Sequence, residues 1–251
     1  MSQNTLILAN KVAVISGSSL GIGAEIGREL ASRGAHIQEA EALAASLPTK
    51  SIAFEADIST TDGLNILVQE ALKAYDRIDI LVNNAALAVN KPFEDQTLED
   101  WDLFVNLIGR GTFLLTQATL PHVPREGGGR IVNIVSIAAR EAPPMQTIYA
   151  GSKGMVDSFT KVWAKELPSK YGIMVNAVSP GPTMTEGFAK AGQSFMEMMR
   201  PAIEKTLVEG RWKKPEEIVF AVGFLCEPRA SWINGLPLIK TEASSSTESV
   251  N

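Results

Sequence analysis

Short apolar runs alternate with longer segments of helical periodicity along the chain. The apolar runs are compact and rich in β-branched residues, which predicts buried strands at residues 11–16, 51–57, 78–85, 129–136 and 173–181, with a candidate last strand at 235–240. Helical spacing of apolar positions predicts helices at residues 24–34, 63–75, 98–120 and 149–167. Strands alternating with helices of this size indicate βαβ units, so we predict an α/β fold with a doubly wound parallel sheet in three layers.

The length of 251 residues suits one large α/β domain. Nothing resembles an interdomain linker before the polar, serine-rich C-terminus. We therefore expect a single domain over residues 1–240 and a disordered tail over residues 241–251.

Composition and charge exclude several classes of function. A formal net charge of −5 argues against nucleic acid or an anionic membrane as the main partner. The N-terminus lacks the features of a signal peptide, and no apolar run approaches the ~20 residues that span a bilayer, so we expect a cytoplasmic protein. The one cysteine, Cys226, excludes an internal disulfide and lies in an apolar helical pattern, which predicts a buried structural thiol.

A glycine-rich stretch lies between the first predicted strand and the first predicted helix. Gly17, Gly21 and Gly23 would allow a tight turn, a close approach of the backbone to a phosphate, and close packing of the helix on the strand. The helix N-terminus would offer free N–H groups to a pyrophosphate. A plain strand–helix turn can also be glycine-rich, but the placement favours a dinucleotide site.

A tyrosine and a lysine four residues apart share one face of a predicted helix. An ammonium group near Tyr149, such as that of Lys153, would lower the tyrosine pKa from about 10 towards neutrality. Taken alone, the pair is better explained by a solvated face of an amphipathic helix. Ser136 favours a catalytic site, because it ends a predicted strand, where an open α/β sheet places its ligands.

The order and spacing of these features make the chain resemble the short-chain dehydrogenase/reductase family, in particular its NAD(P)-dependent 3-oxoacyl- and ketoreductase-like members. The similarity runs from about Asn10 to Gly235. It is carried by the glycine motif, Asp57, Asn83, Asn84, Ala85, Asn106, Ser136, Tyr149, Lys153, Pro180 and Gly181. The resemblance implies a Rossmann-type fold and hydride transfer between NAD(P)(H) and a carbonyl or secondary alcohol, with no metal.

The resemblance also implies a role for each of four catalytic residues. Tyr149 exchanges a proton with the substrate oxygen, and Ser136 orients that oxygen. Lys153 lowers the pKa of the tyrosine and holds the nicotinamide ribose, while Asn106 holds a water molecule that relays protons. An asparagine in an apolar helix can instead bond a neighbouring carbonyl group.

Further positions match the family's cofactor contacts. They are Gly17, Ser19, Leu20, Gly21, Ile22, Gly23, Asp57, Ile58, Asn84, Ala85, Ala86, Tyr149 and Lys153, together with Pro180, Gly181, Thr183 and Thr185 beside the nicotinamide. Asn83 is expected to tie adjacent strands together, and His36 and His122 to have no catalytic role. The residues after the Pro-Gly turn form either a mobile lid over the substrate or ordinary helix packing: Met184, Phe188, Phe195, Met196, Met198 and Met199.

The segment after the first helix departs from the family pattern. Only residues 35–37 suit a second strand before a helical pattern begins at Gln38, so roughly eight to ten residues are missing and the strand is shortened. Either the deletion is real and weakens the adenosine pocket, or residues have been excised and a chain break marks the place. The end of this strand normally carries the acid that binds an NAD ribose or the base that binds an NADP phosphate. Glu39 and Glu41 are expected to face solvent instead.

The sequence also supports expectations on cofactor preference, substrate and assembly. The start of the glycine motif favours NADP(H) over NAD(H), whereas Leu20 occupies a slot where many NADP-using relatives have arginine or lysine. The segment from Ala142 to Met145 favours a mostly hydrophobic small-molecule substrate, and the resemblance implies a homo-oligomer, a dimer or tetramer. Two alternatives stay open: a catalytically impaired relative that serves as a binding or scaffold subunit, and an FAD or nucleotide-sugar enzyme of similar fold.

Overall fold

The computed structural model describes most of the chain: residues 6–39, 46–87, 90–189, 193–204, 206 and 209–239. The expected tail at residues 241–251 and Glu41 lie outside the described residues. Within the described residues, no helix is long and apolar enough to cross a membrane.

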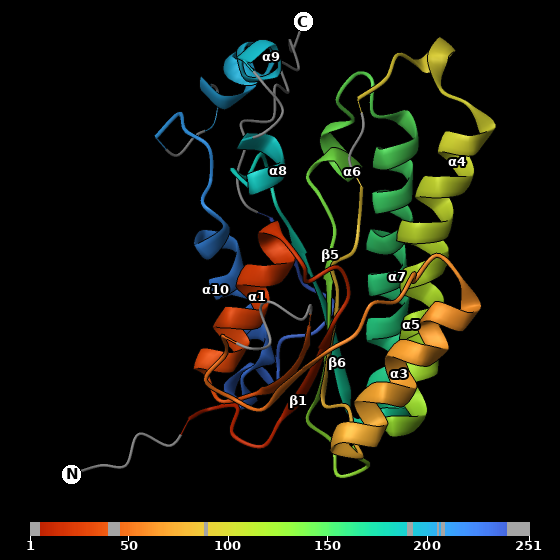
Figure 1. Ribbon diagram of the computed structural model, residues 1–251, viewed down its shortest axis with the longest axis vertical. Helices are drawn as coiled ribbons and strands as arrows, with labels where there is room; N and C mark the ends of the chain where they lie inside the picture. Colours follow the sequence, from red (N-terminus) through yellow and green to blue (C-terminus); the bar gives the residue numbers. More distant parts are fainter. Residues whose placement is uncertain are drawn as a thin grey trace, which may run out of the picture.

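One seven-stranded sheet forms the centre of the molecule (Figure 1). Its strand order is β3-β2-β1-β4-β5-β6-β7, and each neighbouring pair is parallel. The strands are β1 (Val12–Ile15), β2 (His36–Glu39), β3 (Ser51–Ala53), β4 (Ile80–Asn83), β5 (Gly129–Ile134), β6 (Ile173–Ser179) and β7 (Pro237–Ile239). The order reverses between β1 and β4, so the predicted doubly wound α/β fold is confirmed.

Helices cover both faces of the sheet. Figure 1 shows α1 and α10 on one face and α3, α5 and α7 on the other. The helices are α1 (Gly21–Ser32), α3 (Thr61–Tyr75), α4 (Leu98–Phe104), α5 (Gly111–Thr119), α6 (Ala138–Glu141), α7 (Thr147–Tyr171), α8 (Glu186–Ala189), α9 (Gln193–Glu204) and α10 (Pro215–Cys226). The arrangement gives the three layers that the sequence predicts.

Each face of the sheet has its own hydrophobic core. On one side, Ile26 and Leu30 of α1 and Val222 of α10 pack with β1 and β2. On the other, Leu115 of α5 and Trp163 of α7 belong to the core that covers β4, β5 and β6. Strands buried on both faces explain the continuous apolar runs of the sequence.

Cys226 ends α10 inside the first of these cores. The side chain is 4% exposed, and burial raises the pKa of its thiol to about 12. A thiol with this pKa stays protonated near neutral pH and is a poor nucleophile, so the prediction of a buried structural cysteine is confirmed.

The second strand is longer than expected. β2 continues through Gln38 to Glu39, where we expected a helix to begin, and it pairs residue by residue with β1 without a break. The expectation of a helix from Gln38 is wrong because parallel pairing with β1 and β3 outweighs the local helical pattern. The short part of the chain is therefore the crossover after Glu39, at residues 40–50.

Tyr75, at the end of α3, contacts β2 and the residue before β3 at the edge of the sheet. Its hydroxyl contacts the carbonyl oxygens of Lys50 at 3.0 Å and Ile37 at 3.3 Å. Its ring stacks on His36 with ring centroids 5.7 Å apart. The stacking on Tyr75 gives His36 a packing role in the fold, and no catalytic role was expected for this residue.

A row of buried, hydrogen-bonded polar side chains links α5 to α7 through strands β4 and β5. Asn83 Nδ2 donates to Thr116 Oγ1 at 3.0 Å and to Asn133 Oδ1 at 2.9 Å. Asn133 Nδ2 donates in turn to Thr160 Oγ1 at 2.8 Å. The prediction that Asn83 ties adjacent strands together is confirmed.

Candidate active site

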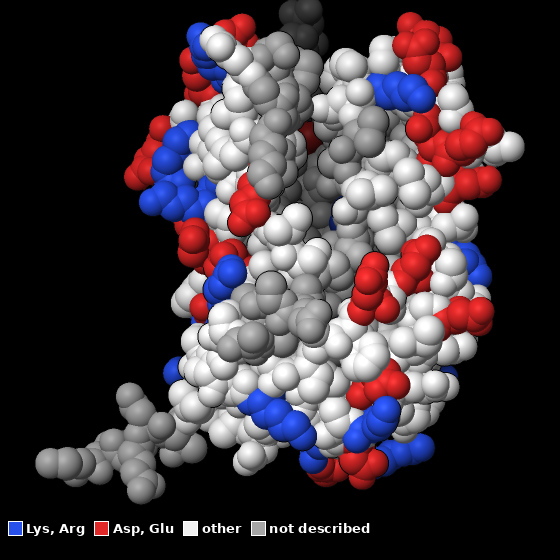
Figure 2. Space-filling model, viewed as in Figure 1, with Lys and Arg blue, Asp and Glu red and all other residues white. Residues whose placement is uncertain are grey.

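The candidate site lies at the carboxyl ends of the strands. The glycine stretch follows β1, Ser136 follows β5, and Pro180 follows β6. In Figure 2 the surface is hollowed at this end of the sheet, between the side formed by α8 and α9 and the side formed by α4 and α7. The parallel arrangement thus collects residues far apart in sequence at one edge.

Two glycines allow α1 to lie close to the end of β4. Gly17 has φ +68°, and a Cβ atom there would lie 2.7 Å from Ala85 Cα. A Cβ on Gly23 would lie 2.2 Å from the carbonyl oxygen of Gly17. Any side chain at either position would displace backbone, so the sequence motif is needed for this packing.

The N-terminus of α1 is suited to a phosphate. Its N-cap, Leu20, makes no side-chain hydrogen bond to the helix, and the first turn has no acidic residue. Backbone N–H groups at the helix start, including those of Gly21 and Ile22, therefore have no side-chain cap, at the positive end of the helix dipole. Leu20 and Ser19 are exposed beside them. These features fit the pyrophosphate of a dinucleotide.

The end of β4 holds the glycine loop in place. The Ser16 hydroxyl accepts hydrogen bonds from the backbone N–H of Asn84 at 3.0 Å and of Ala85 at 3.1 Å. Asn84 Nδ2 donates to the carbonyl oxygens of Ser16 at 3.0 Å and Gly17 at 2.9 Å. Ser16 was missed as a site residue because a hydroxyl in a loop carries no distinctive pattern. Ala86 is exposed next to this link.

Asp57 and Ile58 lie before α3. Asp57 Oδ1 accepts from the backbone N–H of Ser59 at 2.9 Å, and hydrogen bonds with Ser59 hold the pKa of the Asp57 carboxyl below its usual value. Ile58 is buried. Arg110 donates to the carbonyl oxygen of Ser59 at 2.7 Å. Asp57 therefore shapes this turn.

Ser136 and Tyr149 lie together where β5 ends and α7 begins. A side-chain hydrogen bond with Ser136 lowers the pKa of Tyr149, but the larger effect is burial, which raises that pKa above its usual value of about 10. The ring of Phe104 packs edge-on against Tyr149, with centroids 6.3 Å apart. The phenol is therefore fully protonated near neutral pH.

Lys153 lies one turn further along α7 and is almost completely buried. Its Nζ donates to the carbonyl oxygen of Ile134 at 2.6 Å. Burial lowers the pKa of Lys153 to about 7. Burial acts on both groups and disfavours both charged forms, so it raises the pKa of Tyr149 while it lowers that of Lys153. The lowering of the Tyr149 pKa by Lys153 stays a prediction.

Asn106 lies in a π-helical segment, η2 (Val105–Arg110), which divides the single helix expected at residues 98–120. Its carbonyl oxygen accepts from the backbone N–H of Gly111. A Cβ on Gly111 would lie 2.9 Å from the carbonyl oxygen of Ile58. The π-helical turn therefore lies where this helix packs closely on the loop before α3. Such turns are frequent at functional sites. The proton relay through Asn106 stays a prediction.

The residues after β6 contact both the segment that follows β5 and the glycine loop that follows β1. The carbonyl oxygen of Pro180 accepts from Ile137 N–H at 3.1 Å, and Thr183 Oγ1 donates to the carbonyl oxygen of Gly181 at 2.9 Å. A Cβ on Gly21 would lie 3.4 Å from the side chain of Thr185. The segment beside the predicted nicotinamide position thus reaches the glycine loop.

The expected lid falls on α8 and α9. Phe188 packs against Trp212, with ring centroids 5.7 Å apart. The side chains of Phe195 and Met198 lie outside the described residues. The packing of Phe188 fits a lid and an ordinary helix contact equally, so the choice between them stays open.

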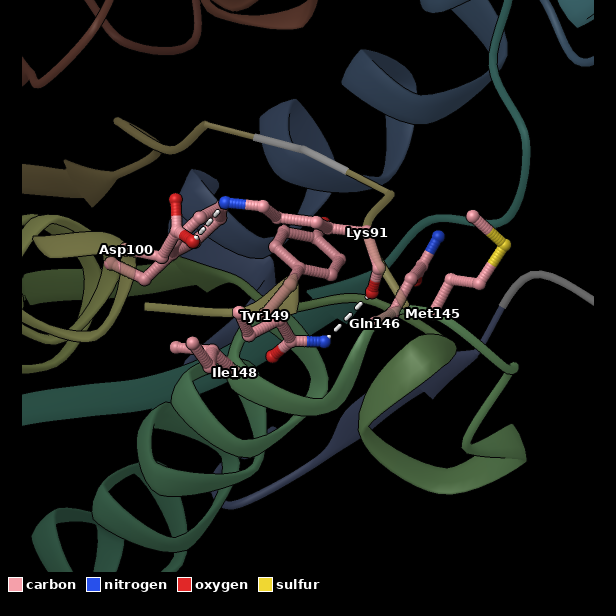
Figure 3. A pocket seen from close by; sticks show the side chains of 8 residues that line it. Lys91, Asp100, Met145, Gln146, Ile148 and Tyr149 are labelled. Atoms are coloured by element: carbon pink, nitrogen blue, oxygen red, sulfur yellow. Dashed lines mark hydrogen bonds and ion pairs between the residues drawn. The ribbon is translucent and has the colours of Figure 1, made fainter. Parts of the chain in front are cut away.

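A depression lies beside Tyr149, between α4 and the first turn of α7 (Figure 3). Lys91 Nζ forms an ion pair with Asp100 Oδ2 at 2.6 Å across one side. Gln96 Nε2 donates to the carbonyl oxygen of Lys91 at 2.8 Å. The depression is lined by Lys91, Gln96, Asp100, Phe104, Met145, Gln146, Ile148 and Tyr149.

Comparisons with known proteins agree on one family. The family model described as enoyl-(acyl carrier protein) reductase matches residues 17–239. The short-chain dehydrogenase/reductase FrzI of a Cladobotryum species is 36% identical, over 91% of this chain and 93% of the relative. The hydroxynaphthalene reductase-like protein Arp2 of Metarhizium anisopliae is 34% identical, over 94% of this chain and 96% of the relative.

Solved structures give the same result. A Burkholderia cenocepacia short-chain dehydrogenase in complex with NADP superposes with a TM-score of 0.84 at 31% identity, covering 93% of this chain and 97% of that one. A short-chain dehydrogenase/reductase from Serratia marcescens gives 0.85 at 32% identity, covering 96% of this chain and 100% of that one.

We predict that Gly23→Ala lowers the free energy of unfolding by about 2–4 kcal/mol, because its Cβ overlaps the Gly17 backbone. Denaturant unfolding measures the change. Gly154→Ala is the matched control, since it lies in helix α7 with no atom within 4 Å of the added Cβ. It should be neutral or raise stability by up to about 1 kcal/mol. Equal effects of the two substitutions would contradict the close packing.

We predict that Lys153→Met stabilises the protein in a pH-dependent way. The folded pKa of about 7 lies below the usual value of about 10.4, so between these pH values the unfolded chain binds more protons and stability rises with pH. The variant should exceed the wild type by on the order of 2–5 kcal/mol at pH 6, and the gap should shrink towards pH 10. Lys165→Met, at an exposed position of α7, should show no such trend; a pH-independent gap for Lys153→Met would refute the burial effect.

Proposed function

Because the chain belongs to the short-chain dehydrogenase/reductase family, we propose that it is an NAD(P)(H)-dependent oxidoreductase that reduces a carbonyl group or oxidises a secondary alcohol. The observation that carries this proposal is the arrangement of Tyr149 beside Ser136, one helical turn before the buried Lys153. The reductase names of the relatives support the direction of carbonyl reduction.

Tyr149 serves as the proton donor in reduction. The nicotinamide, when bound, supplies a hydride to the carbonyl carbon, and the phenol proton of Tyr149 goes to the carbonyl oxygen. Burial keeps the pKa of Tyr149 high, so the protonated form that reduction needs is present at neutral pH. Ser136 donates a hydrogen bond to the same oxygen and orients it.

Lys153 and Asn106 return a proton to the Tyr149 phenol after it has given its own to the substrate. With a pKa of about 7, Lys153 exchanges protons readily at neutral pH, and its place one turn from Tyr149 suits it to hold the nicotinamide ribose. Asn106 holds the water that connects the lysine to solvent. The π-helical turn around Asn106 supports this role.

The carboxyl ends of the strands would hold the cofactor, and the uncapped N-terminus of α1 would bind its pyrophosphate. We propose NADP(H) rather than NAD(H), supported by the NADP bound to the Burkholderia cenocepacia neighbour. Glu39 opposes this preference, because it ends β2, where an acid favours the free ribose of NAD. Binding measurements therefore decide between the two cofactors.

The substrate is a mostly hydrophobic carbonyl compound. The apolar side chains of Phe104, Met145 and Ile148 beside Tyr149 support this, as does the hydroxynaphthalene reductase name of several relatives. Neither a nucleic acid nor a membrane is a proposed partner. A cytoplasmic location is proposed from the sequence.

A homo-oligomer is proposed because apolar side chains are exposed on one side of the molecule. Trp101 on α4, Phe113 on α5 and Val162 on α7 are 53%, 41% and 48% exposed. Such a surface favours burial against a second copy of the chain.

The second candidate function is a non-catalytic binding or scaffold subunit. The observation that favours it is the small number of residues between Glu39, where β2 ends, and Ser51, where β3 begins. The end of this strand is where the adenosine half of the cofactor is expected. The intact arrangement of Ser136, Tyr149 and Lys153 counts against it.

We predict that Tyr149→Phe lowers kcat/KM for ketone reduction about 10²- to 10⁴-fold, since the proton donor is lost. Loss of NADPH absorbance with a panel of ketones and quinones measures the rate. NADPH affinity should change less than about threefold, because the ring remains. Tyr171→Phe, at the far end of α7, is the matched control and should keep full activity. A Tyr149→Phe variant within tenfold of wild type would exclude this role.

We predict that NADPH quenches tryptophan fluorescence at micromolar concentrations and binds more tightly than NADH. Glu39→Ala should leave the ratio of the NADPH and NADH dissociation constants unchanged if Glu39 does not meet the cofactor, and should tighten NADPH binding if its carboxylate repels the 2′-phosphate. Absence of binding by either cofactor would support the scaffold candidate instead.

A further inference from the structure

We propose that Asp157 is a positioning residue for the reaction: through Arg140 it holds the short helix α6 against α7, and α6 in turn fixes the orientation of the Ser136 hydroxyl beside Tyr149. Asp157 thus acts through α6 rather than on the substrate. The inference rests on the proposed carbonyl reduction, which gives Ser136 the task of orienting the substrate oxygen.

Asp157 is a buried carboxylate on the helix that carries Tyr149 and Lys153, and the proposed mechanism gives it no other task. Its side chain is 9% exposed. It follows Lys153 by four residues, so the two lie one turn apart on α7. A buried carboxylate is costly unless groups of opposite charge pair with it. The contacts of Asp157 therefore indicate what the residue does.

Two cations pair with Asp157, and they come from different helices. Arg140 Nη2 donates to Asp157 Oδ1 at 3.1 Å, and Lys161 Nζ donates to Asp157 Oδ2 at 2.6 Å. Lys161 lies one turn further along α7, so its pair stays within that helix. Arg140 belongs to α6, so its pair joins α6 to α7, which lie side by side in Figure 1.

The helix α6 is too short to be stable on its own. It has four residues, Ala138–Glu141, and it ends at Ala142 with φ +46°, in the left-handed region that non-glycine residues rarely adopt. Its apolar contacts come from small side chains, since Ala138 is buried and Ala139 packs in the cluster that includes Tyr149. Alanine buries little apolar area, so α6 depends on a further contact, which the ion pair supplies.

The first turn of α6 sets the orientation of Ser136. The backbone N–H of Ala138 donates to Ser136 Oγ at 3.1 Å, and that of Ala139 donates to the carbonyl oxygen of Ser136 at 3.1 Å. Because the hydroxyl oxygen accepts a bond from α6, its proton points elsewhere and is available to a substrate oxygen. The rotamer of this serine therefore depends on where α6 lies.

The backbone on either side of Ser136 is anchored on β6 instead. The N–H of Val135 donates to the carbonyl oxygen of Val178 at 2.8 Å, and that of Ile137 donates to the carbonyl oxygen of Pro180 at 3.1 Å. A displaced α6 would thus leave Ser136 in the site and release only its hydroxyl from its present orientation. Such a change slows the chemical step, while the glycine loop that suits the cofactor stays intact.

Two matched variants separate the two cations. Arg140→Met and Lys161→Met each remove one partner of Asp157, but only the first removes a contact with α6. We expect Arg140→Met to lower kcat/KM for ketone reduction about 5- to 20-fold, and Lys161→Met to stay within about twofold of the wild type. Arg140→Lys should recover most of the rate, because the contact uses one nitrogen that an ammonium group can replace.

A double-mutant cycle links the effect to Ser136. In a Ser136→Ala protein no hydroxyl is left to orient, so adding Arg140→Met should change kcat/KM by less than about twofold. A general loosening of the protein would instead lower the rate equally in both backgrounds. The dissociation constant of NADPH should stay within about twofold of the wild type when Arg140 is replaced.

Amide hydrogen exchange tests the hold on α6 without any reaction. The N–H groups of residues 138–142 all donate within this turn. They should exchange at least about fivefold faster in Arg140→Met than in the wild type or in Lys161→Met, since the turn opens more often once its tie to α7 is lost.

Three outcomes would overturn the inference: exchange at α6 unchanged in Arg140→Met, equal rates for Arg140→Met and Lys161→Met, or an undiminished effect of Arg140→Met in the Ser136→Ala protein. Failure of the proposed function is distinct from these. The wild-type protein would then reduce no ketone, although exchange at α6 still depended on Arg140; that result would keep the contact and reject the catalytic purpose of Asp157.

Discussion

The packing of the glycine loop against the end of β4 is the contact on which the rest of the site depends. Ser16 and Asn84 hold the loop by four hydrogen bonds between 2.9 and 3.1 Å, and Gly23 brings α1 to within contact of the Gly17 backbone. This aims the uncapped N-terminus of α1 at the edge where Ser136 and Tyr149 lie. A helix displaced by one side chain would point its N–H groups elsewhere.

Burial governs the electrostatics of the two proposed catalytic residues on α7, Tyr149 and Lys153. It raises the pKa of Tyr149 and lowers that of Lys153, so both neutral forms are favoured at the same edge of the sheet. A neutral phenol is ready to give a proton, and a lysine with a pKa of about 7 is ready to replace it. The proposed reduction therefore uses groups whose protonation the fold already sets.

Much of the fold could be predicted because strands buried on both faces leave continuous apolar runs. The proximity of Ser136, Tyr149 and Lys153 could also be predicted, because these residues keep a recognisable spacing. Two features could not. β2 extends through Glu39 because of pairing with β1 and β3, which a local helical pattern does not reveal. The π-helical turn at Asn106 occurs where Gly111 packs on the loop before α3. The sequence of this segment alone predicts an ordinary α-helix. Nonlocal contacts decide both.

The proposed reaction is direct hydride transfer to the carbonyl carbon, with Tyr149 as the proton donor. The most direct measurement is reduction of a ketone with NADPH deuterated at the transferring C4 position, followed by mass spectrometry and NMR of the alcohol. We expect one deuterium on the carbinol carbon with the wild-type protein and almost no alcohol with Tyr149→Phe. Alcohol without deuterium, or equal yields from the two proteins, would contradict it.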